Sequence, residues 1–553
     1  MRQYSRAIHE VMVASGFTRD RSVGSALAFN GSLQAGGKAV RARVIFADGY
    51  LTRLPKLQLL DRRNQLPGVV AHIESDDYVC FAQEADLLLT PDKPKPTVAM
   101  LLQVMSRALD KINRLDLSDE IAREFPQHWL GKLDVCIDAR LERSSPVHLF
   151  TLPGRNPPVL VLAQHADRLT RFGLSAQEAK VANRGGTASH VVVTGQTLTF
   201  RRPTLQPENA KELFDWMEGI EAGLSRRAIG ALASQDRDNL LLFIQGANCT
   251  VGAKIILPPI LRKTIQRPLF LRKLLETRAA DMAIERLSGV AADEKRVFQR
   301  NMGDKPNLSG KQIALIGAGT IGGYLAKFLA QSGAGALGGR LVIFDEQALA
   351  IGNVGRHLLG MSAVGQWKAT ACRDFLRQMY PDNTIDGHNI NVINALDTFL
   401  EYNILVDATG DMGLAGQLDG WRTELMRAKR KAPPIVHSWL VGNGVAAQAL
   451  LVDDSGHACT RCLSTLDNLP RFRILRREHP ASITPASCAD GAYFAYGVGA
   501  SAIAAGLATQ MCLEWANVTP TPRFRTIRVD KEATFEVQDQ NAQKLKGCPV
   551  CAD

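Results

Sequence analysis

Apolar and polar residues follow two different periods in the first part of the chain. Residues 39–46 alternate between the two kinds, which predicts a strand with one buried face. Residues 97–114 carry apolar side chains at helical spacing, which predicts an amphipathic helix. Residues 91–96 contain three prolines and are expected to form a loop. Residues 1–140 are therefore expected to form an α+β domain.

The middle part, residues 141–285, mixes short apolar runs with helical stretches. Residues 159–162 and 240–244 are continuous apolar runs, as in buried strands. Residues 208–222 have helical periodicity. No motif of known chemistry and no internal repeat stands out, so this part is interpreted as an α+β connecting domain.

A strand, a glycine turn and a helix open the last part, residues 286–553. Residues 311–316 form an apolar strand, Gly-Ala-Gly-Thr-Ile-Gly follows, and residues 324–332 continue with helical periodicity. In this context the glycines have distinct tasks. Gly317 permits a tight turn, and Gly319 lets the backbone approach a phosphate. Gly322 lets the helix and the strand pack closely. The pattern predicts a nucleotide-binding α/β domain.

Charged residues after this turn bear on which nucleotide is bound. Asp345 ends the apolar strand 341–344 and is placed to bind ribose hydroxyls. The turn alone suits a nicotinamide cofactor as well as ATP. Arg356 and Lys368 add the positive charge that cleavage of a triphosphate requires. Asp411, shortly after the buried strand that begins at Leu405, is a candidate ligand of Mg²⁺.

Composition and charge set outer limits on the function. The 553 residues are 46% hydrophobic and 22% charged, which excludes wholesale disorder, collagen and a coiled-coil rod. The net charge of +11 permits acidic partners, but nucleic-acid binding is not expected from it. The N-terminus lacks the apolar core of a secretion signal. Residues 493–508 are rich in Gly, Ala and Ser, as in a close-packed core helix, so a cytoplasmic protein without a membrane span is expected.

Four of the ten cysteines form two C-x₂-C pairs. This spacing lets two short turns enclose a tetrahedral Zn²⁺ ion in a closed, structural site, although four unrelated buried cysteines remain an alternative. The four are Cys459, Cys462, Cys548 and Cys551. The remaining cysteines in apolar stretches are expected to be core residues: Cys136, Cys249, Cys372 and Cys512.

Cys488 lies between the two pairs. Ser487 is suited to cap a following helix, so Cys488 would stand at a helix N-terminus, where the dipole favours a thiolate nucleophile. The alternative is a small core residue at the start of a helix.

From Lys311 onward the chain resembles the ThiF/MoeB/ubiquitin-activating superfamily, through the glycine motif, Asp345-Glu346, Asn353…Arg356-His357, Lys368 and Asp407-Ala-Thr-Gly-Asp411. The resemblance implies adenylation of a protein's C-terminal carboxylate with ATP and Mg²⁺, in a homodimer. It implies ribose binding by Asp345, phosphate binding by Asn353, Arg356 and Lys368, and metal binding by Asp411.

The resemblance extends to further residues. Cys488-Ala-Asp-Gly is similar to the stretch that carries the acyl-accepting cysteine in some members, and the zinc pairs recur in bacterial ones. Members also use an arginine before the first strand, for which Arg296 and Arg300 are candidates. The chain departs from the family in having Met412, where Asp-Asn is usual, and Leu358 after His357. These departures concern fine positioning.

The N-terminal domain resembles bacterial ubiquitin-conjugating-like domains. His72 precedes Cys80, and residues 124–129 are similar to a recurrent ending of those domains. No His-Pro-Asn precedes Cys80, so the amide that stabilises an oxyanion is not identified. Alone, Cys80 would be interpreted as a buried small residue, and His72 as structural. Joined to an activating domain, Cys80 is expected to be a transfer cysteine.

The expected architecture is multidomain: an α+β ubiquitin-conjugating-like domain, an α+β connecting domain, and a Rossmann-like α/β adenylation domain with a four-cysteine zinc site. This order resembles the conjugation enzymes of CBASS antiphage operons. It implies that a cGAS-like nucleotidyltransferase or a ubiquitin-like protein is activated, passed to Cys488 and then Cys80, and joined to a target amine. The alternative is a sulfur-carrier-protein adenylyltransferase without a conjugation step.

Overall fold

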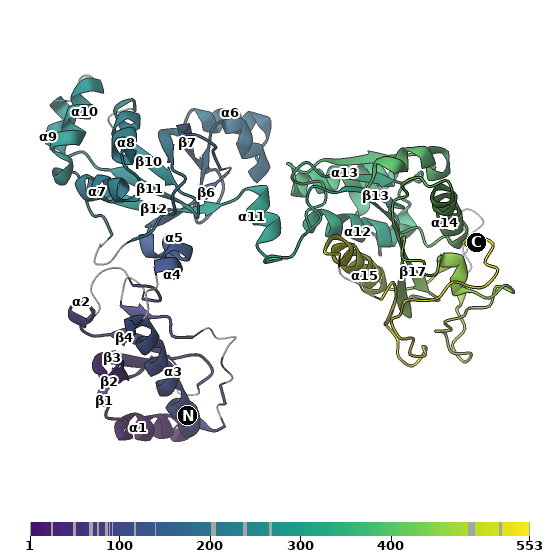
Figure 1. Cartoon of the computed structure of the whole chain (residues 1–553), viewed down its shortest axis with the longest axis horizontal. Helices are drawn as coiled ribbons and strands as arrows, with labels where there is room; N and C mark the ends of the chain where they lie inside the picture. The colour runs from purple at the N-terminus through teal and green to yellow at the C-terminus, as the bar shows by residue number, and fades with distance from the viewer. Residues whose placement is uncertain are drawn as a thin grey trace. The chain divides into compact units, whose positions relative to one another are not determined.

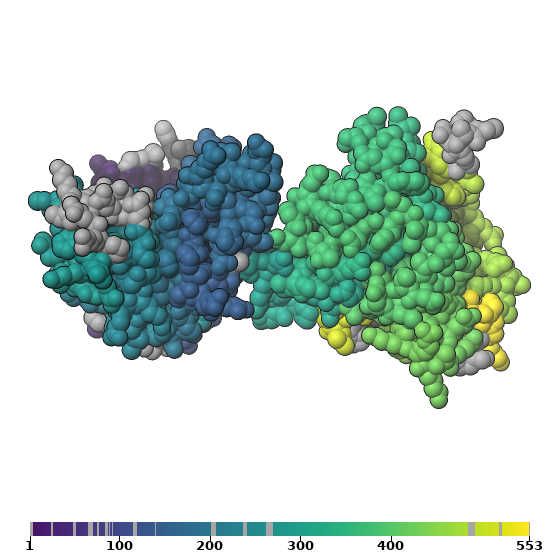
Figure 2. Space-filling model, turned by 90° about the horizontal axis from the view of Figure 1, so that it is seen from above, coloured from purple at the N-terminus to yellow at the C-terminus, as the bar shows by residue number. Residues whose placement is uncertain are grey.

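The computed structural model describes the chain except at residues 1, 24–25, 48–50, 66–69, 74–76, 83–86, 88, 91, 115–117, 139, 201–205, 236–239, 265–267, 485–492, 519–521 and 552–553. Contacts divide it into two compact units, Met1–Asp293 and Glu294–Asp553. Figures 1 and 2 draw the first unit in purple to teal and the second in green to yellow.

The first unit begins with an antiparallel sheet covered by helices. Its strands follow chain order: β1 Thr18–Asp20, β2 Leu27–Ala35, β3 Lys38–Phe46, β4 Lys56–Leu59 and β5 Tyr78–Val79. The predicted strand at 39–46 is confirmed as β3, whose buried side chains include Val40, Ala42 and Val44. Two helices pack on each other beside this sheet, α1 (Arg2–Ala14) and α3 (Pro94–Arg114).

The start of α3 corrects one prediction. Residues 91–96 were expected to form a loop, but α3 begins at Pro94 and includes Pro96 in its first turn. The first four N–H groups of a helix have no partner within it, so prolines there cost no hydrogen bond. Pro94 and Pro96 therefore mark a helix start, whereas Pro91 lies outside the described residues.

The remainder of the first unit is built on a closed barrel in the order β10-β11-β12-β6-β8-β7-β9. Its strands are β6 Leu133–Ile137, β7 Ser145–Leu152, β8 Val159–Ala163, β9 Thr187–Val193, β10 Leu240–Gln245, β11 Thr250–Ile255 and β12 Ile284–Ala291. The predicted runs at 159–162 and 240–244 are confirmed as β8 and β10. The accompanying helices are η2 Ala166–Phe172, α6 Ala176–Asn183, α7 Ala210–Ile220, α8 Leu224–Ala233, α9 Pro259–Thr264 and α10 Pro268–Thr277.

An aromatic cluster packs the helix α5 (Phe125–Trp129) against the barrel part of the first unit. Phe125 and Trp129 lie on this helix, which follows α4 (Ser118–Arg123). Their rings contact Phe200 and Trp216, with centroids 4.8 to 6.2 Å apart. The Trp129 indole N–H also donates to a backbone carbonyl of β11, at 3.1 Å. Phe125 and Trp129 therefore hold α5 against the barrel and against α7.

The second unit is a Rossmann-type α/β fold. Its sheet has the order β15-β14-β13-β16-β17-β18-β21, in which the first five strands are parallel and the last two antiparallel. The strands are β13 Gln312–Ile316, β14 Arg340–Phe344, β15 Ile385–His388, β16 Ile404–Asp407, β17 Ile435–Val441, β18 Ala446–Val452 and β21 Phe524–Arg528. The strands β14 and β15 are added on one side of β13 and β16 and β17 on the other, so β13 and β16 meet at a switch point, where such sheets bind ligands.

Helices cover both faces of this sheet. One face packs against α12 (Thr320–Gln331), α13 (Lys368–Met379) and α15 (Val498–Ala516), and α12 and α15 lie side by side (Figure 1). The other face packs against α14 (Met412–Arg427) and η6 (Val392–Glu401). The core helix predicted at 493–508 is confirmed as a helix, α15. It begins only at Val498, after a short strand, β20 (Tyr493–Phe494). Among the described residues, none of the helices combines the length and apolarity that a membrane crossing requires.

Candidate active site

A cavity of about 900 Å³ opens where β13 and β16 end. Its wall contains the glycine turn after β13, the acidic residue after β14 and the loop after β16. Six of the residues proposed from the sequence line it: Gly317, Gly319, Asp345, Asn353, Arg356 and Asp411. The fold thus brings into one site residues that are up to 94 positions apart in the sequence.

Two of the three glycines of the turn have little room for a side chain. Gly317 has φ +88°, a conformation that favours glycine. A methyl group on Gly322 would lie 1.8 Å from the Gly317 carbonyl oxygen, so only glycine fits there. Gly319 caps the N-terminus of α12, and a methyl group there would meet open space. The first N–H groups of α12 are therefore open to an anion.

Two polar side chains fix the shape of this turn. The Asp345 carboxylate accepts hydrogen bonds from the N–H groups of Ala318 (2.7 Å) and Gln347 (2.8 Å). His357 is buried, and its Nε2 lies 2.7 Å from the Ala318 carbonyl oxygen. Its Nδ1 accepts from the Leu359 N–H, so Nε2 carries the proton and donates. Burial lowers the pKa of His357, with Lys368 adding to the effect, which keeps the ring neutral.

Arg356 lies between the cavity and the chain that follows residue 492. Its Nη1 donates to the Phe494 carbonyl oxygen (2.9 Å), and its guanidinium lies 4.5 Å from the ring centre of Tyr496. The Tyr496 hydroxyl is 2.8 Å from that of Thr320 at the start of α12. A cation on an aromatic ring beside a helix N-terminus gives this wall a positive potential.

Lys368 is the one proposed phosphate ligand that does not line the cavity. It is buried, and its Nζ donates to the Gln347 side chain at 2.8 Å. Gln347 itself lines the cavity. The charge of Lys368 therefore reaches the site through Gln347, a residue that the sequence analysis did not select.

Asp411 begins α14 as its N-cap. One carboxylate oxygen accepts from the N–H groups of Gly413 (2.8 Å) and Leu414 (3.1 Å). The side chain is exposed in the cavity wall. A carboxylate oriented by a helix terminus is a suitable oxygen ligand for a divalent cation.

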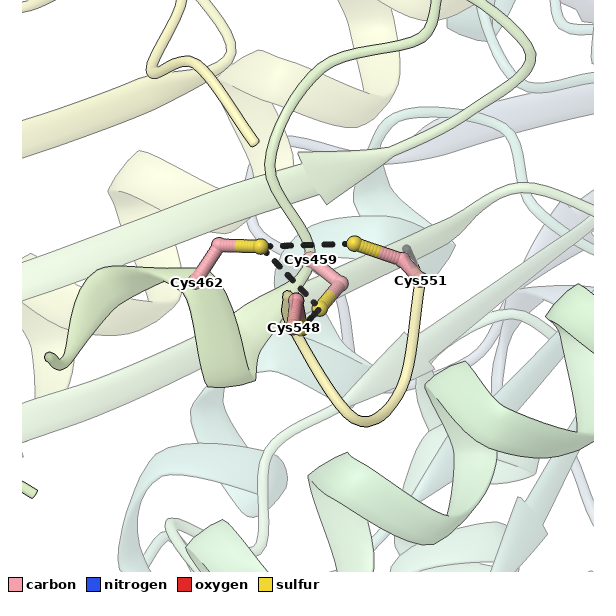
Figure 3. A group of neighbouring side chains, drawn as sticks. All are labelled: Cys459, Cys462, Cys548 and Cys551. Atoms are coloured by element: carbon pink, nitrogen blue, oxygen red, sulfur yellow. Dashed lines mark hydrogen bonds between the residues drawn. The ribbon is translucent and has the colours of Figure 1, made fainter. Parts of the chain in front are cut away.

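The four paired cysteines meet in one cluster, shown in Figure 3. All are buried, and their sulfurs lie within 4.8 Å of one another. The Sγ atom of Cys459 lies 3.7 Å from the Sγ atoms of Cys462 and Cys548. The Sγ atoms of Cys462 and Cys551 lie 3.3 Å apart. A zinc ion with four bonds of about 2.3 Å separates its sulfurs by about 3.8 Å. The cluster is therefore of a size that holds a metal ion.

Cys80 lies on the surface directly after β5. Its N–H donates to the His72 carbonyl oxygen at 2.8 Å, and the His72 ring contacts Glu120 at 2.6 Å. Cys80 is exposed, so the interpretation of Cys80 alone as a buried small residue is wrong. A hollow of about 250 Å³ formed with Leu54, Lys56 and Phe81 adjoins the cysteine. His72 thus fixes the backbone next to an accessible thiol.

Gly322 is not among the described residues that line the cavity. Gly322 lies within α12, behind the turn. Cys488 and Ser487 lie outside the described residues. The predicted cap at Ser487 and the predicted nucleophile Cys488 therefore stay predictions, and the next described helix, α15, begins at Val498 with Gly497 as its N-cap.

The other cysteines divide by burial. Cys372 and Cys512 are fully buried, and burial raises the pKa of both thiols to about 12. This confirms them as core residues. Cys136 and Cys249 are half-buried, and burial raises the pKa of Cys249 to about 12.

Two family comparisons match the two ends of the chain. The ThiF family matches residues 298–550, and prokaryotic E2 family B matches residues 2–137. The chain is a fusion of an E2-like domain and a ThiF-family domain. The first match contains the cavity and three of the four clustered cysteines and ends one residue before Cys551, and the second match contains Cys80.

Relatives of the fused enzyme have the same extent. The ATP-dependent ubiquitin transferase-like protein Cap2 of Pseudomonas aeruginosa (strain BWHPSA011 / Pa011) is 27% identical, over 91% of this chain and 90% of the relative. Cap2 of Vibrio cholerae is 23% identical, over 93% and 92%. A solved structure of MccB from E. coli with ATP is 18% identical, over 44% of this chain and 67% of that chain, with a TM-score of 0.33.

Proposed function

We propose that this enzyme uses ATP to activate the C-terminal carboxylate of a partner protein and joins it to an amine of a target. The observation that carries the proposal is the cavity that unites Gly319, Asp345, Arg356 and Asp411 in a chain that also contains an E2-like domain. The printed names of the relatives, ATP-dependent ubiquitin transferase-like protein, support the same interpretation.

The first step is adenylation. Asp345 binds the ribose, and the N–H groups at the start of α12, with Asn353 and Arg356, bind phosphates. Lys368 adds its positive charge through Gln347. An oxygen of the partner's carboxylate attacks the α-phosphorus and pyrophosphate leaves. Fixed positive charge lowers the energy of this transition state because it requires no reorganisation during the reaction. Mg²⁺, which Asp411 would hold, supplies further neutralisation of the phosphates.

The next steps move the acyl group between sulfurs. The Cys488 sulfur attacks the acyl carbon, AMP leaves and the thiol proton is lost. The Cys80 sulfur then displaces Cys488, and a target amine displaces Cys80 to leave an amide bond. Each thioester preserves the activation derived from ATP. The exposure of Cys80 and the adjoining hollow fit a site that must admit a second protein.

A structural metal ion and partner proteins are also part of the proposed function. The cysteine cluster holds Zn²⁺ as a structural ion, since four thiolates leave no open coordination position. The activated protein is a cGAS-like nucleotidyltransferase or a ubiquitin-like protein of an antiphage operon. The enzyme acts as a homodimer in the cytoplasm.

Mass spectrometry under non-reducing conditions tests this function. The full chain is incubated with ATP, Mg²⁺ and each candidate partner, and the masses of the intact chain and of its cysteine peptides are measured. We expect ATP-dependent adducts of the partner's C-terminus on Cys488 and Cys80. Adducts on neither cysteine would refute the proposal, and one on Cys488 alone would favour a sulfur-carrier adenylyltransferase.

A further inference from the structure

A row of buried polar residues extends from the cavity loop after β16 to the cysteine cluster. Asp407 ends β16, His437 lies in the middle of β17, and Asp419 lies on α14. Thr460 lies between Cys459 and Cys462 on η7 (Thr460–Leu463). Exposure of these four residues is 5% or less. None of the adenylation steps above uses His437, Asp419 or Thr460.

The contacts in this row are continuous and almost symmetric. His437 Nδ1 lies 2.8 Å from Asp407, and Nε2 lies 3.0 Å from Asp419. The other oxygen of Asp407 accepts from the N–H (3.0 Å) and hydroxyl (2.7 Å) of Thr409. The other oxygen of Asp419 accepts from the N–H (2.8 Å) and hydroxyl (2.5 Å) of Thr460. Each carboxylate thus links the imidazole to one threonine.

The charge state of His437 follows from its partners. Ionised carboxylates only accept hydrogen bonds, so two such partners require an N–H on both ring nitrogens. Burial lowers the pKa of His437, but the attraction of Asp419 and the hydrogen bonds with Asp407 and Asp419 outweigh it and raise the pKa to about 10. The row therefore contains a buried imidazolium between two carboxylates.

Both ends of the row reach sites that bind a ligand in the proposed function. At one end, the Thr409 hydroxyl accepts from the N–H of Asp411, and Thr409 lines the cavity. At the other end, Thr460 follows the ligand residue Cys459 directly. Breaking a buried charge pair is costly because it leaves a charge uncompensated. The two ends are thus held in one arrangement.

We propose that His437 is a positioning residue that couples the cavity loop at Thr409–Asp411 to the metal held by the cysteine cluster, so that nucleotide and metal strengthen each other's binding. The proposal rests on the proposed function in taking the ligand of the cavity to be ATP. A metal that orders the turn at Thr460 orders Asp419, and through His437 it orders Asp407 and the loop. By linkage, the nucleotide must raise the metal affinity by the same factor.

Equilibrium competition for zinc measures this coupling in the full chain. The zinc affinity is determined against a zinc-selective chromogenic chelator, with and without Mg²⁺ and a non-hydrolysable ATP analogue. Calorimetry on the same samples measures binding of the analogue. We expect the analogue to tighten zinc binding at least about fivefold, the lower end of usual coupling factors.

Three variants separate coupling from general destabilisation. In His437→Gln the analogue should no longer change the zinc affinity. Thr460→Val removes only the hydroxyl bond at the cluster end and should reduce the coupling even if His437→Gln does not fold. Ser438→Ala is the control, since Ser438 is the next residue of β17, is equally buried and bonds to α15 instead. A purely structural role would weaken zinc binding equally with and without the analogue.

The outcomes distinguish this inference from the proposed function. If the analogue binds but leaves the wild-type zinc affinity unchanged, or if both variants retain full coupling, the inference is wrong and the adenylation proposal stands. If calorimetry shows no binding of the analogue, the proposed function itself fails. If the full chain binds no zinc, the coupling is refuted as well.

Discussion

Among the glycines that the structure describes, Gly322 is the one with the least room for a side chain. A methyl group there would overlap the Gly317 carbonyl oxygen at 1.8 Å, and a backbone atom cannot yield as a flexible side chain can. We predict that Gly322→Ala lowers the free energy of unfolding by at least about 1–3 kcal/mol, the usual cost of overpacking, and abolishes ATP–pyrophosphate exchange. Thermal unfolding and the exchange assay measure the two effects.

A matched control is Gly506→Ala. Gly506 also lies inside a helix, α15, but a methyl group there would meet nothing within 4 Å. Alanine in place of glycine in a helix stabilises by roughly 0.5–1 kcal/mol. Equal losses in the two variants would show that the helices, and not the contact with Gly317, determine the effect.

His357 should make stability depend on pH. In the folded chain, burial lowers the pKa of His357 below its ordinary value of 6.5. Between the lowered value and 6.5 the unfolded chain binds the proton that the folded chain rejects, so the free energy of unfolding falls as pH decreases below about 6.5. His357→Gln removes this contribution, so we predict a shallower loss of stability between about pH 7 and pH 5, measured by denaturant unfolding.

His479→Gln is the control for this titration, because it alters an exposed histidine of the same unit. The loss of stability with falling pH should be shallower in His357→Gln than in His479→Gln. If His357→Gln retains the full slope, the ring is already protonated in the folded chain. That result would contradict the tautomer assigned from the Leu359 and Ala318 contacts.

Some residues of the site could be identified from the sequence alone, and others could not. Asp345 and Arg356 were identified because a motif fixes their spacing, and both line the cavity. Tyr496 and His437 were not, because their contacts depend on strands and helices that meet only in the folded chain. The one signal for His437 was a histidine inside an apolar run, which periodicity interprets only as part of a strand.

For helices and strands, the sequence predicted the type of an element better than the residues at which the element begins and ends. The core helix α15 starts at Val498, five residues after the expected start, since Tyr493–Phe494 pair with β19 (Ile483–Thr484). A two-residue strand has no periodicity to detect. The start of α3 was misplaced because proline was interpreted as a breaker, although it suits the first turn of a helix.

The cysteine cluster should stabilise the end of the second unit. Cys548 and Cys551 hold the last described residues against η7, after β21. A metal that binds only the folded state stabilises it by about 4 kcal/mol when its free concentration is a thousand times the dissociation constant. We predict that Cys551→Ser lowers the melting temperature and makes the C-terminus sensitive to protease.

Cys249→Ala is the matched change at a cysteine of the first unit, outside the cluster. It should leave the bound zinc, measured by elemental analysis, unchanged. Loss of zinc in Cys551→Ser without any change in unfolding or proteolysis would mean that the ion has no structural role.

The whole molecule combines two units, and the sequence predicted their kinds from different signals. The ThiF-family region was evident from motifs, whereas the E2-like region depended on one cysteine and one aromatic ending. The boundaries predicted at 140 and 285 remain predictions. The strand β6 begins at Leu133 and belongs to the barrel, and one hydrophobic core contains buried residues of both the N-terminal sheet and the barrel. Such a shared core has no signature in local sequence.

The fusion predicts that activation and conjugation can be separated by one substitution. Cys80→Ala leaves the cavity of the second unit unaltered, so ATP–pyrophosphate exchange should stay within about twofold of the wild type. The product amide should decrease by at least about a thousandfold, on the scale of removing a nucleophile. Because its exit is blocked, the thioester on Cys488 should accumulate, which non-reducing mass spectrometry would detect.

Cys136→Ala provides the comparison for Cys80→Ala. Cys136 is a cysteine of β6 in the same unit, and burial raises the pKa of its thiol, so it makes a poor nucleophile. Its loss should leave the amide yield near the wild-type level. If Cys80→Ala forms the amide at the wild-type rate, the acyl group passes from the second unit directly to the amine. The E2-like domain would then bind the target without carrying the acyl group.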